Sequence, residues 1–269
     1  MRRVDPEPGW PESWRYSFPY DEQEIYVEVR SPGYVYAYDN RQRQALRLLA
    51  ETVPPGGRVL DLAAAQGNFS LALAENGYRV TWNDLRADLE GYVRLKHERG
   101  DIEFAPGNVF DLEFSAPFDA VLMTEIIEHV AHPDRFLTKA AALVRPGGVI
   151  VMTTPNGAYF RNRLPRFADC ADPSIFESAQ FKPDSDGHIF LLHPDEVYTL
   201  AARAGLVVDE LVLFTNPLTN GHLKTAAALQ ALPRSFVATV EQVTTRLPTF
   251  VRRRLCVQLA ARFVRERSV

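Results

Sequence analysis

Two carboxylates and an imidazole lie close together in the middle of the chain. Glu125, Glu128 and His129 occupy positions i, i+3 and i+4, so a helical turn there would bring the three side chains to one face. Such a set suits general base chemistry, with His129 accepting a proton near neutral pH. It equally suits coordination of Mg²⁺, Mn²⁺ or Fe²⁺ by oxygen and nitrogen ligands. A structural interpretation also stays open, in which both carboxylates favour a helix N-terminus and His129 only packs.

The elements that would position these residues alternate regularly between strand and helix. After the insertion that follows Thr154, a helix from Pro194 to Ala204 and a strand from Leu206 to Phe214 resume the pattern. Because this alternation gives right-handed crossovers, it predicts an α/β fold with a doubly wound, mostly parallel sheet and helices on both faces. Before the insertion we expect strands at 58–62, 78–82, 102–105, 118–123 and 148–153, and helices at 68–75, 87–99 and 133–144.

The first expected strand runs into a turn of small residues, which includes Ala63, Ala65 and Gly67. In a doubly wound sheet, such a turn lets the backbone approach a ligand where the strand order reverses. Alanine fits a tight turn of this kind only if its φ stays negative. Asp84 ends the second strand, about twenty residues further on, where a carboxylate binds ribose hydroxyls. The Gly-rich fingerprint of a NAD-dependent oxidoreductase is absent, so another nucleotide-like ligand is favoured.

Taken in order, the motifs resemble those of the class I S-adenosylmethionine-dependent methyltransferases over residues 40 to 215. That family has a Rossmann-like, seven-stranded sheet that closes with an antiparallel strand, so we favour a strand over a helix at 255–264. The motifs that carry the resemblance are the segments 58–69, 105–112, 118–125 and 143–154.

The resemblance also implies a binding site for S-adenosylmethionine. The turn from Asp61 through Ala63 and Ala65 to Gly67 would lie beneath the methionine tail and the ribose, and Asp84 would bind the ribose hydroxyls. Asn108 stands where the family more often has Asp, and its side-chain oxygen still accepts a hydrogen bond from adenine. The implied cofactor-binding residues are therefore Asp61, Ala63, Ala65, Gly67, Asp84, Asn108, Val109 and Thr124.

The segment from Glu125 to Asp134, with the run from Thr153 to Asn156, resembles the ubiquinone-biosynthesis O-methyltransferases and the small-RNA 2′-O-methyltransferases. Both groups methylate a hydroxyl beside a second oxygen. In the RNA group the matching residues bind a divalent metal with a later histidine, and the run from Asp186 to Phe190 is a near match to that later motif. The resemblance implies catalytic roles for His129 and Glu128, and a site for Mg²⁺ or Mn²⁺ made by Glu125, Glu128, His129 and His188.

A chain of 269 residues with 46% hydrophobic residues suits a single domain. Residues 1–38 are rich in Pro, Trp and Tyr and show no sustained helical period, which predicts an irregular arm packed over the domain. A helix is expected from Asn40 through Glu51. The predicted parts are an aromatic arm at 1–40, a cofactor-binding core at 41–155, a substrate-side insertion at 156–190, a second core segment at 191–215 and a C-terminal extension at 216–269.

The overall charge restricts the class of partner. A net charge of −4 and an isoelectric point near 5.9 do not favour nucleic acid, so a small-molecule or glycan substrate is expected. Arginines concentrate between Arg246 and Arg267, which predicts either a solvated face or peripheral contact with an anionic membrane. Two distant cysteines, with no leader or membrane span, predict a cytoplasmic protein. The sequence carries no signal for the oligomeric state.

The leading functional prediction is an S-adenosylmethionine-dependent O-methyltransferase that acts on a small molecule or glycan, with or without metal assistance. Three alternatives remain: an RNA 2′-O-methyltransferase, an N-methyltransferase acting on an amino sugar, and a cofactor-binding protein that has lost catalysis. The last follows from the alanines in the turn after the first strand.

Overall fold

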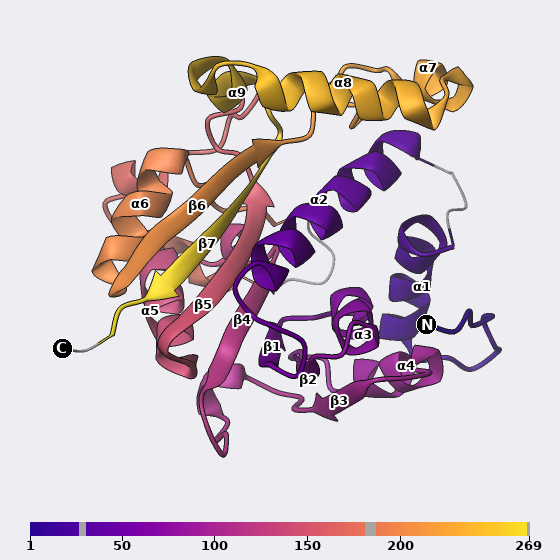
Figure 1. Cartoon of the computed structure of the whole chain (residues 1–269), viewed down its shortest axis with the longest axis vertical. Coiled ribbons are helices and arrows are strands. Elements are labelled where there is room, and N and C mark those ends of the chain that lie inside the picture. The colour runs from indigo at the N-terminus through magenta and orange to yellow at the C-terminus, as the bar shows by residue number, and fades with distance from the viewer. Residues whose placement is uncertain (27–30, 181–186, 268–269) are drawn as a thin grey trace.

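A computed structural model of the chain describes residues 1–26, 31–180 and 187–267. Within these residues, seven strands form one sheet in the order β3-β2-β1-β4-β5-β7-β6 (Figure 1). The strands are β1 (Arg58–Leu62), β2 (Arg79–Asn83), β3 (Asp101–Phe104), β4 (Phe118–Thr124), β5 (Val144–Pro155), β6 (Leu206–Phe214) and β7 (Gln258–Arg265).

The strand order reverses between β1 and β4, because the chain first runs outward from β1 to β3 and then crosses back. β1 pairs in parallel with both β2 and β4. β7 lies antiparallel between β5 and β6, so the strand that was expected at 255–264 is present. These pairings confirm the prediction of a mostly parallel, seven-stranded Rossmann-like sheet, and the reversal marks the position where such sheets bind ligands.

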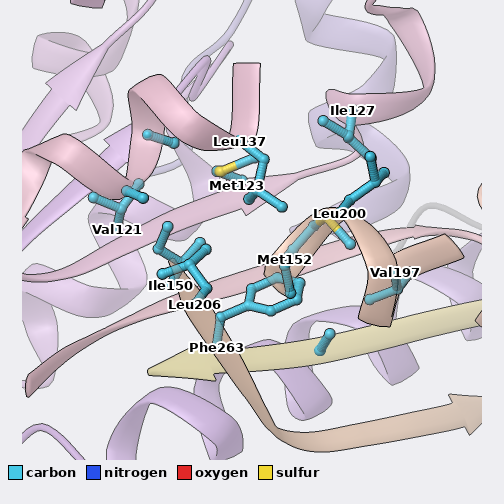
Figure 2. Packing of buried hydrophobic residues seen from close by; sticks show 14 of the residues in the cluster. Val121, Met123, Ile127, Leu137, Ile150, Met152, Val197, Leu200, Leu206 and Phe263 are labelled. Atoms are coloured by element: carbon cyan, nitrogen blue, oxygen red, sulfur yellow. The ribbon is translucent and has the colours of Figure 1, made fainter. Parts of the chain in front are cut away.

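Helices cover both faces of the sheet because alternate strand residues point to opposite sides. On one face, Leu60, Val121 and Met152 pack against α5 (Pro133–Leu143) and α6 (Pro194–Arg203). Figure 2 shows this layer, in which Leu137 and Leu200 meet the strand residues. The other face packs against α2 (Pro32–Ala50) and α3 (Asn68–Glu75), whereas α4 (Leu89–Lys96) covers β2 near the sheet edge.

The N-terminal segment is more regular than its sequence predicts. Residues of the expected irregular arm form α1 (Glu12–Glu24), and α2 begins at Pro32 instead of Asn40. The prediction was wrong for a physical reason, because the side chains that α1 buries are polar: Ser17, Asp21, Glu22 and Glu24. A search for apolar residues at helical spacing does not detect such a helix.

The insertion folds back toward the end of β4. It contains two short 3₁₀ segments, Phe167–Asp169 and Pro173–Ala179. Phe167 and Phe176 pack on Phe190, and Gln180 accepts a hydrogen bond from the backbone N–H of Ala131 at 2.9 Å. The insertion therefore covers the segment that carries the predicted reactive residues.

The C-terminal extension forms a helical layer made of α7 (Ala226–Ala231), α8 (Arg234–Arg246) and α9 (Thr249–Leu255). The layer lies across the top of Figure 1, above α2 and the end of β6. Among the described residues, no helix is both long and apolar enough to cross a membrane.

Candidate functional site

A pocket of about 720 Å³ opens at the carboxyl ends of β1, β2 and β4. Its wall is built from the turn after β1, the end of β2, the 3₁₀ segment Val109–Asp111, the start of α5, and residues of α1 and α2. Asp61 and Gly67 are not on this wall. Six of the eight predicted cofactor-binding residues line the pocket, namely Ala63, Ala65, Asp84, Asn108, Val109 and Thr124.

The turn after β1 is built from left-handed residues. The φ angles are 57° at Ala63 and 47° at Ala65, so the turn forms although these alanines do not keep the negative φ that alanine prefers. The backbone N–H of Ala65 donates to Asp84 Oδ2 at 2.9 Å, which ties the turn to the end of β2. Gly67 is also left-handed, and a Cβ there would come within 2.7 Å of Val93. Gly67 therefore lets the turn pack on α4.

Ala65→Gly is expected to stabilise the protein by about 0.5–1 kcal/mol. A left-handed alanine costs about 1–2 kcal/mol, which glycine avoids. Glycine also loses more backbone entropy than alanine when the chain folds, and this loss offsets only part of the stabilisation. Urea unfolding monitored by circular dichroism measures the change. Ala72→Gly, inside α3, is the matched control and should lose about 1 kcal/mol. Destabilisation of both variants would contradict strain at Ala65.

Two carboxylates lie near this turn in different environments. Asp84 lines the pocket, and its Oδ1 accepts the backbone N–H of Arg86 at 2.9 Å. Asp61 is fully buried behind the pocket, and its Oδ2 accepts a hydrogen bond from Ser70 Oγ at 2.6 Å. Burial raises the pKa of the Asp61 carboxyl to about 7. Asp84 is thus placed to meet a ligand, whereas Asp61 lies beneath the turn.

Asn108 organises the opposite wall of the pocket. Its side-chain oxygen accepts the backbone N–H of Phe110 at 3.3 Å, and its Nδ2 donates to Asp111 at 2.7 Å. These bonds cap the 3₁₀ segment and present Val109 and Phe110 to the cavity. Because an amide oxygen has two lone pairs, the oxygen keeps capacity for a ligand.

Glu125 does not belong to the donor cluster that the other two members of the predicted reactive set form. The expected helical turn is absent here, because Glu125 has a φ of 51° and the 3₁₀ segment Ile127–His129 begins only afterwards. The backbone N–H of Glu125 bonds to the carbonyl of Thr153 at 3.0 Å, which extends the strand pairing by one residue. Its carboxylate lies 3.1 Å from the guanidinium of Arg41. Glu125 is therefore an ion-pair partner on the pocket wall.

Glu128, His129 and His188 form a cluster in which one ligand atom from each lies within 4.8 Å of the others. The two imidazole rings are 4.9 Å apart, and the backbone N–H of Ile189 donates to the carbonyl of Glu128 at 2.7 Å. The insertion thus brings His188 to His129, as the sequence predicts. Asp186, from the same motif, lies outside the described residues.

Within this cluster, His129 faces the pocket and Glu128 lies behind it. Glu128 is fully buried, and its Oε2 accepts a hydrogen bond from Thr154 at 2.9 Å. Its Oε1 is buried without a hydrogen bond among the described residues. Burial, followed by the nearby Glu125 carboxylate, raises the pKa of Glu128 well above its usual range. An unsatisfied buried oxygen of this kind favours a bound cation or a proton.

Arg41 is the main pocket residue that sequence reasoning missed. It comes from α2, pairs with Glu125 at 3.1 Å and with Glu24 at 4.0 Å, and lies over the ring of Tyr38. Burial opposes its charge, yet the neighbouring carboxylates raise the pKa of Arg41 further. The sequence around Arg41 contains no motif that would distinguish this arginine from a surface arginine. Its place in the pocket follows only from contacts between segments that are distant in the sequence.

Comparison with known proteins settles the family. A family model described as a methyltransferase domain matches residues 36–211, which is well over half of the chain. The chain belongs to the S-adenosylmethionine-dependent methyltransferase family. The predicted family is thereby confirmed, and the methyltransferase has its pocket where this family's fold reverses its strand order.

The curated relatives include ubiquinone biosynthesis O-methyltransferases. The protein of that name from Xanthomonas axonopodis pv. citri is 36% identical to the methyltransferase over 167 residues, which are 60% of this chain and 67% of that protein. The one from Aromatoleum aromaticum is 31% identical over 169 residues, which are 61% of this chain and 70% of that protein.

Solved structures share the fold of the methyltransferase at low identity. The N-methyltransferase NodS from Bradyrhizobium japonicum, in complex with S-adenosylhomocysteine, has a TM-score of 0.54 and 14% identity, and the match covers 96% of this chain and 100% of NodS. A Haloferax volcanii methyltransferase structure, a complex with the activator Trm112, has a TM-score of 0.57 and 17% identity, with coverage of 96% and 99%. Since one of these is an N-methyltransferase, the fold does not specify the accepting atom.

Proposed function

We propose that the methyltransferase transfers the methyl group of S-adenosylmethionine to a hydroxyl that neighbours a second oxygen on a small molecule or glycan. The observation that carries this proposal is the imidazole of His129 on the pocket wall, backed by Glu128 and His188. Relatives named ubiquinone biosynthesis O-methyltransferase support an oxygen acceptor. An alcohol must lose its proton as it attacks, so a base beside the pocket favours O-methylation over transfer to a neutral amine.

The residues of the chain have distinct tasks in this reaction. Methyl transfer is an in-line displacement, so the pocket must hold the acceptor oxygen, the methyl carbon and the sulfur in line and exclude water. His129 accepts the hydroxyl proton. Arg41 and Glu125 hold each other on the pocket wall through their ion pair. Asp84 and the turn at Ala65 bind the ribose side of the cofactor.

Metal assistance is supported by the unsatisfied Glu128 Oε1 and by the convergence of three donors. Carboxylate with imidazole suits Mn²⁺, Mg²⁺ or Fe²⁺. Glu128, His129 and His188 would hold the ion, and Glu125 would remain paired with Arg41. A bound cation would lower the pKa of a substrate hydroxyl. In that form of the site, His129 would be a ligand, and the cation would supply the stabilisation of the substrate oxygen that His129 supplies as a base in the metal-free site.

A matched acceptor panel tests the proposal. We expect the purified protein to convert S-adenosylmethionine to S-adenosylhomocysteine with a catechol, to do so at least tenfold more slowly with the corresponding monophenol, and to leave the corresponding aniline unmethylated. Mass spectrometry of the product identifies the accepting atom. Methylation of the aniline, an amino sugar or an RNA 3′ end, with no reaction at any diol, would contradict the proposal.

The same panel, run after chelator treatment and again with added Mn²⁺ or Mg²⁺, tests the metal. If the metal assists, activity falls with the chelator and returns with the ion. The Glu128→Gln variant should then lose this response and retain binding of S-adenosylmethionine in a calorimetric titration. Full activity in the presence of the chelator would show that no metal assists the reaction, and His129 would then act as the base alone.

A further inference from the structure

The helical layer α7–α9 carries an exposed apolar stripe. Phe236 and Val243 lie seven residues apart in α8 and therefore share one side of that helix, and Phe250 follows in α9, after the break at Pro248. Their side chains are 51%, 53% and 74% exposed. Further large apolar side chains are exposed in the same segment at Leu218, Leu223 and Leu232. A group of exposed apolar side chains with charged residues around it is typical of a surface that contacts a protein or a membrane.

A neighbouring side of α8 is fixed against the domain. Val237 is buried, and Glu241 accepts the backbone N–H of Asn216 at 2.9 Å. The Asn216 side chain also donates to Thr244 at 2.8 Å. Because these inward contacts set the rotation of α8, Phe236 and Val243 are held exposed to solvent.

The charge around the stripe is strongly positive. Residues 223–255 hold six cationic side chains and one carboxylate, Glu241, which is turned inward. Five of the six cations are exposed, at Lys224, Arg234, Arg246, Arg253 and Arg254, and Arg253 pairs with Asp195 at 3.1 Å. The chain as a whole carries a net charge of −4, so this positive surface is local.

The arginines between Arg246 and Arg267 fall into two groups, those that pair within the sheet and those that are exposed on the helical layer. Arg262, on β7, is largely buried and pairs with Asp209 and Glu51 at 2.6 and 2.8 Å. Arg265 bonds to the backbone carbonyls of Ala142 and Val144. These two arginines stabilise the sheet and are not available to a partner, whereas Arg246 and Arg254 of the helical layer are exposed.

We propose that the α7–α9 layer docks the methyltransferase on an anionic membrane surface. The apolar stripe inserts at the boundary between head groups and acyl chains, and the surrounding cations contact lipid phosphates. A second copy of the chain is a poorer occupant, because a symmetric contact would bring the same cations of both copies together. This docking is independent of the methyl acceptor.

Vesicle co-sedimentation with the full chain tests the docking. We expect binding to vesicles of phosphatidylcholine and phosphatidylglycerol, and at least tenfold weaker binding to vesicles of phosphatidylcholine alone. The triple variant Phe236→Ser, Val243→Ser, Phe250→Ser should lose binding to both. Each exposed arginine near the surface contributes about fivefold, so Arg246→Gln with Arg254→Gln should weaken binding by more than tenfold.

Ile175→Ser is the matched control, because Ile175 is 67% exposed but lies in the 3₁₀ segment Pro173–Ala179 of the insertion and not in α7–α9. It should bind vesicles like the wild type. Absence of sedimentation with anionic vesicles, or equal binding by the triple variant, would overturn the proposal. So would a dimer, detected by light scattering, that the triple variant dissociates, since the stripe would then belong to a contact between copies. Thermal melts of all variants confirm that they fold.

Discussion

Replacing His129 with alanine is expected to slow methyl transfer by about 10²- to 10⁴-fold, the usual contribution of a positioned general base. Binding of S-adenosylmethionine should persist, because the predicted ribose and adenine contacts come from other parts of the wall, such as Asp84 and Val109. Single-turnover assays with a catechol acceptor and calorimetric titration of the cofactor measure the two effects separately.

Added imidazole distinguishes a proton acceptor from a packing residue. Free imidazole should restore part of the activity of His129→Ala, because it can occupy the vacated space and accept the proton. His132→Ala is the matched control: His132 also lines the pocket, but its Nε2 lies 2.8 Å from Glu177 of the insertion. This control should keep most of its activity and show no response to imidazole. Wild-type activity in His129→Ala would refute the role as base.

Lys96→Met is expected to destabilise the fold by about 3–5 kcal/mol, the usual cost of removing one partner of a buried ion pair. Both Lys96 and Asp21 have no exposed surface, and their charged atoms lie 2.7 Å apart. Lys96 Nζ also donates to Asn68 Oδ1 at 2.8 Å. Without the ammonium group, the Asp21 carboxylate stays buried and is left with hydrogen bonds from Tyr92 and Asn68. Urea unfolding measures the loss.

Two further variants isolate the buried charge as the cause. Arg94→Met removes an exposed cation from the same helix, where it pairs with Glu90 at 2.8 Å, and should cost under about 0.5 kcal/mol. The double variant Lys96→Met, Asp21→Leu should recover a large part of the stability, because it removes the stranded carboxylate. If the double variant is no more stable than Lys96→Met alone, lost packing is the cause.

The sheet was predictable because its signal is local. β4 and β5 contain uninterrupted apolar runs at 120–123 and 149–152, and the helices of the predicted pattern have apolar residues on one side. α1 was missed because it buries Asp21 and Glu24 against Lys96, Asn68 and Gln66, which are polar partners from other parts of the chain. Polar residues that become buried through distant contacts look like surface residues in the sequence.

Part of the site was predictable because it too has a local signal in the sequence. Residue types at the strand ends identified the small-residue turn, Asp84 and the cluster at His129. The backbone at Glu125 was not predictable, because its left-handed φ depends on pairing with β5 and on an ion pair with Arg41 from a helix more than eighty residues earlier in the chain. Whether the predicted cofactor residues contact S-adenosylmethionine stays a prediction.

The position of β7 in the sheet constrains the order in which the protein can assemble. β5 and β6 both leave the ribosome before β7, yet neither pairs with the other, since β7 lies between them. A nascent chain therefore exposes two unpaired strand edges until translation has passed residue 265. Exposed edges of this kind promote association between chains. Ribosome pausing after β6 and before β7 should thus favour aggregation.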